Sequence, residues 1–255
     1  MTLTDTEAWR RQLEFIRGYI RWIGTASAGA EVWEAPGVMA AIVPVAAIRS
    51  IPNSVVHEDA QALAGSYDAL ARAYRDAGVE MWTVWLHEDD SEARAFLEGK
   101  GHEFDGEPVA MALDFSEWQP EDLGDLDWDA EASFDELGRL NDLAYGYDAE
   151  TGMAPAMGAP AGDIPIHLYR ARVEGEVACV LGTIDEGDDS GIIFVATVPE
   201  ARGRGLASRL MTAALIEAKG RGMKTSSLQA SALGSPIYER LGYRTYFRFN
   251  ILERR

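Results

Sequence analysis

The chain has 255 residues, enough for one large domain or two small ones. Its 42 acidic and 23 basic side chains give a formal net charge of −19, which argues against nucleic acid as a partner because phosphates would be repelled. The longest apolar run, residues 38–48, is too short for a membrane span, which needs about 20 residues. The N-terminus carries acids where a secretory signal carries basic residues, so we expect a cytoplasmic protein with no membrane partner.

Helical and strand patterns alternate in the first half of the chain. Trp9, Leu13, Ile16 and Ile20 recur at steps of three and four residues, which predicts a helix over residues 5–23. The patterns that follow predict, in order, apolar strands near 31–33 and 38–45, a helix over 59–75, a strand over 81–86, a short helix over 91–98 and a strand over 109–115.

An acidic segment follows. Seven of the 15 residues from 117 to 131 are acidic, and such a run is usually solvated and weakly structured. We therefore expect a linker at residues 119–125, between a first domain of residues 1–118 and a second domain of residues 126–255.

The second half opens with a predicted helix over residues 134–145. The Gly/Ala/Pro-rich stretch 150–162 cannot continue a regular helix, and we expect a mobile loop there. The remaining patterns predict strands over 164–173, 177–184 and 192–198, a helix over 205–219, a strand over 225–229, a short helix over 235–241 and a strand over 245–252. This order of helices and strands indicates an α/β fold.

The two halves end on a similar layout. Residues 95–102 (AFLEGKGH) align with residues 236–243 (PIYERLGY), and both segments follow a helix, a glycine stop and a strand. The similarity predicts two copies of one α+β unit. Chance likeness of two strand–helix–strand pieces is the alternative.

A glycine-rich turn between a strand and a helix carries the most informative chemistry. Arg202-Gly203-Arg204-Gly205 separates the β-rich residues 192–198 from the next helix, whose first amides lack internal partners and attract anions. Residues 199–255 carry 11 basic and 4 acidic side chains in an otherwise acidic chain, which agrees with an anion site. The turn suits a pyrophosphate, and the alternative is a basic turn on a solvated face.

The second domain resembles the GNAT acetyltransferase superfamily. The family's phosphate motif, Gln/Arg-x-x-Gly-x-Gly/Ala, matches residues 202–207 (RGRGLA), and Pro199 precedes it as usual. A strand and a short helix that end in Tyr-x-x-x-Gly-aromatic match residues 228–243. The resemblance implies two GNAT-like domains with mixed, mostly antiparallel sheets, and a splayed strand at the acyl-CoA site of the second.

The first domain looks like a degenerate copy of the same fold. His57, Glu58 and Asp59 stand where the phosphate turn belongs, and two acids there would repel a pyrophosphate. Leu97 stands where Tyr238 stands in the second copy. We expect this half to bind no cofactor, and to support the second domain or help wall its acceptor site.

The resemblance implies acetyl-CoA as co-substrate and assigns roles to individual residues. The backbone of Thr197 and Val198 would pair with the pantetheine arm at a β-bulge. Tyr238 would act as the general acid that protonates the departing thiolate. The other binding residues that it implies are Arg202, Gly203, Arg204, Gly205, Leu206, Ala207 and Ser231.

The sequence does not identify a general base. Many relatives carry a glutamate on the strand before the phosphate turn, whereas residues 192–198 contain no ionisable side chain. A water chain, the region of Asp148 and Glu150, or a backbone carbonyl are the alternatives. No metal site is expected, because the four histidines have no ligand spacing and Cys179, the one cysteine, lies in an apolar stretch.

The predicted function is transfer of an acetyl group from acetyl-CoA to a primary amine of a small molecule or peptide. Acidic surroundings would steer a cationic acceptor to the site. One alternative is another acyl-CoA-dependent transferase, similar to mycothiol synthase. The other is a non-catalytic regulatory protein that binds acyl-CoA. The resemblance also allows a homodimer.

Overall fold

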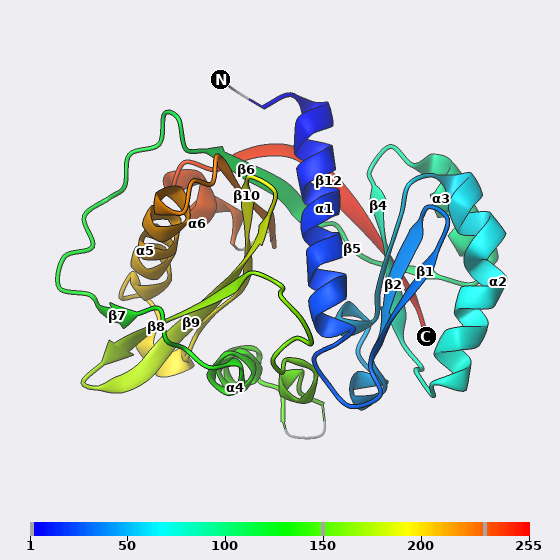
Figure 1. Ribbon diagram of the computed structural model, residues 1–255, viewed down its shortest axis with the longest axis horizontal. Helices are drawn as coiled ribbons and strands as arrows, with labels where there is room; N and C mark the ends of the chain where they lie inside the picture. The colour runs from blue at the N-terminus through cyan, green and yellow to red at the C-terminus, as the bar shows by residue number, and fades with distance from the viewer. Residues whose placement is uncertain (1–2, 149–150, 232–233) are drawn as a thin grey trace.

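The computed structural model describes residues 3–148, 151–231 and 234–255 (Figure 1). Its strands form one twelve-stranded mixed sheet in the order β1-β2-β3-β4-β12-β6-β11-β10-β9-β8-β7, with β5 also paired to β12. Helices cover the sheet, so the predicted mixed α/β class is confirmed. Among the described residues, no helix combines the length and the apolar character that crossing a membrane requires.

The first half begins with a helix that matches its prediction to the residue. Helix α1 starts on a capping box, in which the Thr4 hydroxyl accepts from the Glu7 N–H and the Glu7 carboxylate accepts from the Thr4 N–H. The elements of this half are α1 (Asp5–Ile23), β1 (Glu31–Ala35), β2 (Val38–Ile42), η1 (Pro44–Ala46), η2 (Ile51–Asn53), β3 (Ser54–His57), α2 (Ala60–Asp76), β4 (Trp82–His87), α3 (Ser91–Gly99), β5 (Glu103–Gly106) and β6 (Val109–Asp114).

The second half repeats much of this order. Helix α4 also starts on a capping box, between Ser133 and Glu136, and ends at Gly146 in the left-handed conformation. The elements of this half are β7 (Asp127–Asp129), α4 (Phe134–Tyr145), η3 (Ala154–Ala156), β8 (Ile166–Val173), β9 (Glu176–Glu186), β10 (Asp189–Thr197), η4 (Pro199–Ala201), α5 (Leu206–Gly220), β11 (Thr225–Ala230), α6 (Ser235–Arg240) and β12 (Arg244–Arg254).

The two halves exchange their last strands. Strand β6 of the first half lies between β11 and β12, with Val109 opposite Ala230 and Asp114 opposite Thr225. Strand β12 continues into the first half, where it pairs with β4 and β5. One continuous sheet therefore replaces the two separate sheets that the repeat suggests.

Helices α1 and α4 lie between the two parts of the sheet, and the other helices flank them (Figure 1). One core joins Phe15, Ile20 and Trp22 of α1 to Leu137 and Leu140 of α4. A second core packs α5 on β9 and β10, and a third packs α2 on β2 and β4. This arrangement places α1, from the first half, over strands of the second half.

Two segments differ from their predictions. The acidic run contains strand β7, because Asp127 and Asp129 form ion pairs with Arg170 and Arg172 of β8, which relieve the like-charge repulsion. Residues 119–125 run along the surface and are mostly exposed.

The Gly/Ala/Pro-rich stretch also differs, since its described part, residues 151–162, packs against the first half. Met157 is buried, and the Trp22 indole donates a hydrogen bond of 2.8 Å to the Gly158 carbonyl. The Asp142 carboxylate accepts from the N–H groups of Met153 and Ala154. These contacts order a segment whose local sequence favours an irregular chain.

Candidate functional site

Strands β10 and β11 are parallel neighbours that separate almost as soon as they meet. Their pairing is confined to Asp189 opposite Thr225. A β-bulge then places Phe194 and Val195 of β10 opposite a single residue of β9, and Phe194 has φ 50°. The bulge lies slightly before the position expected at Thr197 and Val198. The sheet is splayed between β10 and β11, as the resemblance implies.

The glycine-rich turn lies at the end of β10. Gly203 has φ 77° and Gly205, the N-cap of α5, has φ 71°, a region in which glycine has no steric cost. A Cβ at either position would meet no atom within 4 Å, so there is room above the turn for a ligand. No side chain caps the helix, and its first N–H groups remain available to an anion.

The other residues of the turn that were predicted to bind a ligand differ in their exposure to solvent. Arg202 and Arg204 are exposed and Ala207 is half-buried, whereas the Leu206 side chain is buried in the second core. Leu206 therefore anchors the start of α5, and any contact that it makes with a ligand is through its main chain.

The corresponding turn of the first half, residues 57–59, differs in the group that occupies the N-terminus of the following helix. Asp59 caps α2, and its carboxylate accepts a hydrogen bond of 2.8 Å from the Ala62 N–H. A negative group of the chain itself thus occupies the position that Gly205 leaves open at α5.

The edge of β10 beside the turn is divided between two strands. The Val198 N–H donates to the Ala178 carbonyl of β9 at 3.0 Å. Because backbone groups alternate along a strand, the backbone N–H and C=O of Thr197 point away from β9, whereas its hydroxyl donates to Cys179 Sγ of β9. The Thr197 carbonyl accepts from Arg202 Nε at 3.3 Å, and the same guanidinium donates to the Ala144 carbonyl of α4. Thr197 is therefore the predicted residue whose backbone faces the splayed side.

Tyr238 lies on α6, across the opening from β10. It is half-buried and packs against Tyr243 with ring centroids 6.2 Å apart. Burial raises the pKa of Tyr238 to about 12, with a smaller contribution from Tyr145. The phenol is accordingly protonated at neutral pH and can donate a hydrogen bond.

Ser231 is exposed at the end of β11, and its hydroxyl accepts from the Gly234 N–H at 3.2 Å. Residues 232–233, within the second predicted motif, lie outside the described residues.

Two adjoining cavities occupy the opening between β10 and β11. We name the smaller one, of about 270 Å³, the tyrosine cavity; it is lined by Ile51, Asn141, Tyr145, Tyr147, Met153, Ile192, Phe194, Val195, Leu228, Gln229, Ser231 and Tyr238. We name the larger one, of about 710 Å³, the central cavity; it is lined by Phe15, Ile16, Tyr19, Ile51, Trp85, Asp105, Gly106, Glu107, Pro108, Tyr145, Ile192, Ile193, Phe194, Gln229, Ser231 and Ile251. Six residues are common to both, so the two spaces share a wall.

The sequence analysis does not single out several of the lining residues. Asn141 and Gln229 are polar residues inside regular elements, and no local pattern singles them out. Gln229 donates to the Gln12 side chain of α1, which itself donates to the carbonyls of Met111 and Leu228. This chain of amides ties α1 to β11 beside the cavities.

The carboxylates near the site come from unexpected places. Asp105 of β5 and Glu107, on the connection from β5 to β6, line the central cavity. Burial raises the pKa of Asp105, and the neighbouring Glu253 adds to the effect. Asp148 is held by Thr151, and Glu150 lies outside the described residues.

Asp189 and Cys179 are buried titratable groups beside these strands, and neither lines the two cavities. Burial raises the pKa of Asp189 to about 6; one of its carboxylate oxygens accepts from the Thr225 hydroxyl, and the other has no hydrogen-bond partner among the described residues. Burial likewise raises the pKa of the Cys179 thiol to about 11, which disfavours its thiolate.

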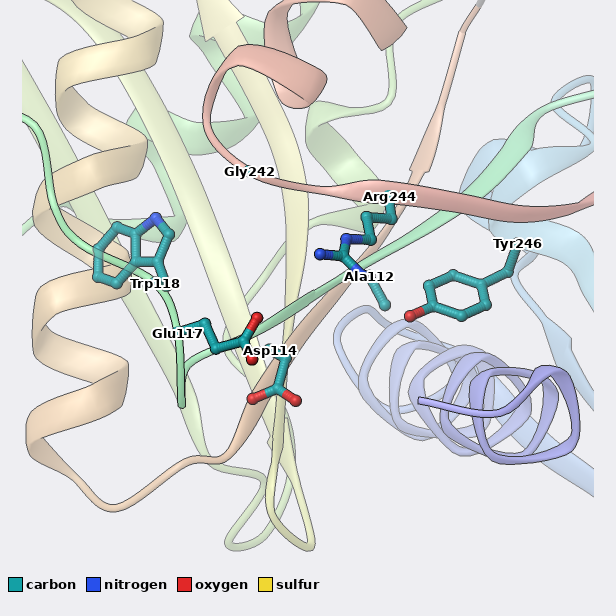
Figure 2. A pocket seen from close by; sticks show the side chains of 7 residues that line it. All are labelled: Ala112, Asp114, Glu117, Trp118, Gly242, Arg244 and Tyr246. Atoms are coloured by element: carbon teal, nitrogen blue, oxygen red, sulfur yellow. The ribbon is translucent and has the colours of Figure 1, made fainter. Parts of the chain in front are cut away.

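A further cavity of about 240 Å³ lies where β6 and β12 cross, and shares no lining residue with the other two (Figure 2). Arg244 and Tyr246 of β12 face it together with Asp114, Glu117 and Trp118. Both signs of charge meet in this space. Among the described residues, no cluster of histidine, cysteine and acidic side chains has the arrangement of a metal site.

Comparison with known proteins points to one family. Residues 188–246 match the family model described as an acetyltransferase (GNAT) domain. This segment contains β10, the glycine-rich turn, α5, β11 and α6. A search of curated protein sequences finds no match.

Solved structures show the fold over the rest of the chain. A GCN5-related N-acetyltransferase from Kribbella flavida superposes over 100% of this chain and 96% of its own, with a TM-score of 0.69 and 17% identity. A tandem GNAT protein from the clavulanic acid biosynthesis pathway covers 94% of this chain and 86% of its own, with a TM-score of 0.60 and 11% identity. A GCN5-related N-acetyltransferase from Sphaerobacter thermophilus covers 86% and 76%, with a TM-score of 0.58 and 14% identity. The chain therefore has the GNAT fold, as its motifs indicate.

Proposed function

We propose that this chain, which has the GNAT fold and a GNAT domain match over residues 188–246, transfers an acetyl group from acetyl-CoA to a primary amine. One observation carries the proposal. The splayed β10–β11 pair opens toward an uncapped helix N-terminus on one side and toward Tyr238 on the other. An open helix N-terminus and a protonated phenol on one opening support the proposal, because the first suits a pyrophosphate and the second can donate to a departing thiolate.

The residues present fit the pyrophosphate and pantetheine of acetyl-CoA. The free space over Gly203 and Gly205 allows close approach to the first amides of α5, and Arg202 and Arg204 add positive charge. The backbone of Thr197 faces the splayed side and can pair with an amide, which replaces its contact with Arg202. We assign the main-chain contact to Thr197 more than to Val198, whose N–H already serves β9.

Acetyl-CoA supplies the thioester that is attacked. The amine nitrogen forms the new C–N bond, the C–S bond breaks, the nitrogen loses a proton and the sulfur leaves as a thiolate that gains one. Tyr238 holds a proton at neutral pH and donates it, as a hydrogen bond or by transfer, to the departing sulfur. A water takes the proton from nitrogen.

We also propose that residues 1–118 are a degenerate copy of the domain at 126–255. Three features support this: the repeated element order, the exchange of β6 for β12, and α3 and α6 ending alike before Gly101 and Gly242, both with positive φ. The carboxylate of Asp59 at the α2 N-terminus supports a first copy that binds no acyl-CoA.

The test combines titration calorimetry with a free-thiol assay over a panel of amines. We expect acetyl-CoA to bind, and thiol to be released only when an amine is present. Binding without thiol release for any amine would favour a regulatory acyl-CoA-binding protein. Release with longer acyl-CoAs but not with acetyl-CoA would favour another acyltransferase. Absence of both binding and release would refute the proposal.

A further inference from the structure

We propose that the central cavity is the acceptor site, and that it selects a cationic amine with an aromatic or branched apolar body and no carboxylate or phosphate. The inference rests on the proposed acetyl transfer and names its substrate class. The wall of the central cavity, its charged side and its shared wall with the tyrosine cavity support this assignment.

The aromatic wall of the central cavity is apolar and has few free hydrogen-bonding groups. The Tyr19 hydroxyl donates to the Ile51 carbonyl at 3.3 Å, and the Trp85 indole N–H donates to the Ser54 hydroxyl at 3.0 Å. Because their polar ends are already paired within the protein, these two rings present apolar surface to the cavity. Phe15 and Ile16, each 2% exposed, extend this surface along α1.

Packing holds the wall in place. A Cβ on Gly191 of β10 would lie 2.3 Å from Cδ2 of Phe15, so the ring sits directly on the strand that carries the bulge. The Gln12–Gln229 hydrogen bond fixes the same helix to β11. A preformed apolar pocket of this size accommodates a ring-sized group, since small-molecule sites are commonly 300–1,000 Å³ in volume.

The acidic side of the cavity determines the charge of the ligand. Asp105 and Glu107 face it, and Glu253 lies behind Asp105. Arg255 pairs with Asp105 at 3.3 Å, and Arg248 approaches Glu107 at 3.9 Å. Arg255 also pairs with Glu253, so carboxylates outnumber arginines here. The resulting field attracts an ammonium group and repels an anionic acceptor.

The position of the acids favours an apolar amine over a long acyl chain as the occupant of the central cavity. The acyl chain of a long acyl-CoA would need apolar surface along its whole length, whereas this cavity carries carboxylates on one side. An apolar amine matches both features, because the carboxylates attract its positive charge as it approaches, while its body fills the apolar space and its nitrogen, once deprotonated, lies at the wall shared with the tyrosine cavity. Nine of the 16 lining residues belong to residues 1–118, which gives the first half a role in acceptor choice.

The experiment compares three amines at saturating acetyl-CoA: 2-phenylethylamine, propylamine and phenylalanine. Burial of a phenyl ring predicts a kcat/KM for 2-phenylethylamine about 10-fold or more above that for propylamine. The carboxylate of phenylalanine should lower kcat/KM by about 10-fold or more relative to 2-phenylethylamine. Titration calorimetry of 2-phenylethylamine into the protein without acetyl-CoA measures the cavity independently of turnover.

Two exposed acids provide a matched pair of variants. Glu107→Gln should raise KM for 2-phenylethylamine about 3-fold at low salt with kcat unchanged, and added salt should remove the difference. Glu121→Gln, in the linker, removes the same charge from the surface and should leave KM unchanged.

The possible failures can be told apart. Equal kcat/KM for all three amines, or a preference for phenylalanine, would overturn this inference while leaving acetyl transfer intact. Faster reaction with octanoyl-CoA than with acetyl-CoA would assign the cavity to the acyl chain. Failure to bind acetyl-CoA, with calorimetric binding of 2-phenylethylamine retained, would refute the proposed function and keep the cavity as an amine site. Absence of calorimetric binding would overturn the assignment of the cavity itself.

Discussion

Tyr238→Phe removes one hydroxyl from the tyrosine cavity and tests the assigned proton donor. Burial holds the pKa of Tyr238 at about 12, whereas an ordinary thiol has a pKa of about 8.5. Full proton transfer from this phenol to a thiolate is therefore unfavourable. The main contribution of Tyr238 is a hydrogen bond to the negative charge that develops on sulfur. A hydrogen bond to a charged group contributes about 1.5–3 kcal/mol. We expect kcat to fall by about 10–100-fold, with acetyl-CoA affinity nearly unchanged.

The assay is steady-state thiol release, with titration calorimetry for affinity. Tyr246→Phe, which makes the same change in the cavity of Figure 2, is the matched control and should retain full activity. Because the Tyr238 pKa lies above the assay range, its ionisation should not lower the rate between about pH 6 and 9. An unchanged kcat for Tyr238→Phe in the folded variant would refute the assignment.

Three further predictions concern the turn and the buried titratable groups. Gly205→Val, at φ 71°, should weaken acetyl-CoA binding by about tenfold or more in calorimetry, whereas Gly187→Val, at φ 62° in the β9–β10 turn, carries similar strain and should leave affinity unchanged. Asp189→Asn removes a carboxyl whose folded pKa of about 6 lies above its ordinary value, so the carboxyl costs stability as the pH rises through 6. Relative to the unsubstituted chain, the variant should therefore gain up to about 3 kcal/mol in free energy of unfolding by urea near pH 7.5 and little near pH 4. An equal gain at both pH values would contradict this. His102 has a folded pKa of about 4 because burial disfavours its charged form, so its contribution is present above about pH 6.5 and lost as the pH falls toward 4. An NMR titration of its ring with a midpoint near 6.5 would contradict that environment.

Local patterns are sufficient to predict the helices and most of the strands. Helices over residues 5–23 and 134–145 match their predictions to the residue, because apolar periodicity and terminal residues are properties of consecutive positions. Strands β3, β5 and β7 were missed, since each has three or four residues and depends on a partner strand distant in the sequence.

The same distinction between local and long-range features applies to the candidate site. The turn at residues 202–207 is a contiguous motif, so its open helix N-terminus can be predicted. The central cavity is built by Phe15, Trp85 and Asp105, which meet only after α1 docks on β10 and the sheet passes from one half to the other. No spacing along the chain encodes that meeting, and a chemical class for the acceptor therefore needs the structure.

The exchange of β6 and β12 leads to a prediction about the boundary itself. A cut at the 119–125 linker leaves residues 126–255 without β6, the strand that separates β11 from β12. Met111 and Leu113 of β6 are at most 1% exposed, and loss of one such side chain commonly costs about 2–5 kcal/mol. Loss of these two side chains alone is thus comparable to the ~5–15 kcal/mol that keeps a typical domain folded, and the fragment also loses the backbone pairing of β6 with β11 and β12.

We expect residues 126–255 alone to show no cooperative thermal unfolding by circular dichroism and to bind no acetyl-CoA. Co-expression with residues 1–118 should restore a one-to-one complex on a sizing column and recover binding, because each fragment then supplies the other's missing strand. A fragment of residues 126–255 that unfolds cooperatively and binds acetyl-CoA with the affinity of the full chain would refute this reasoning. Since β12 runs from α6, which carries Tyr238, into the first half, the exchange also couples acceptor-site assembly to folding of both halves.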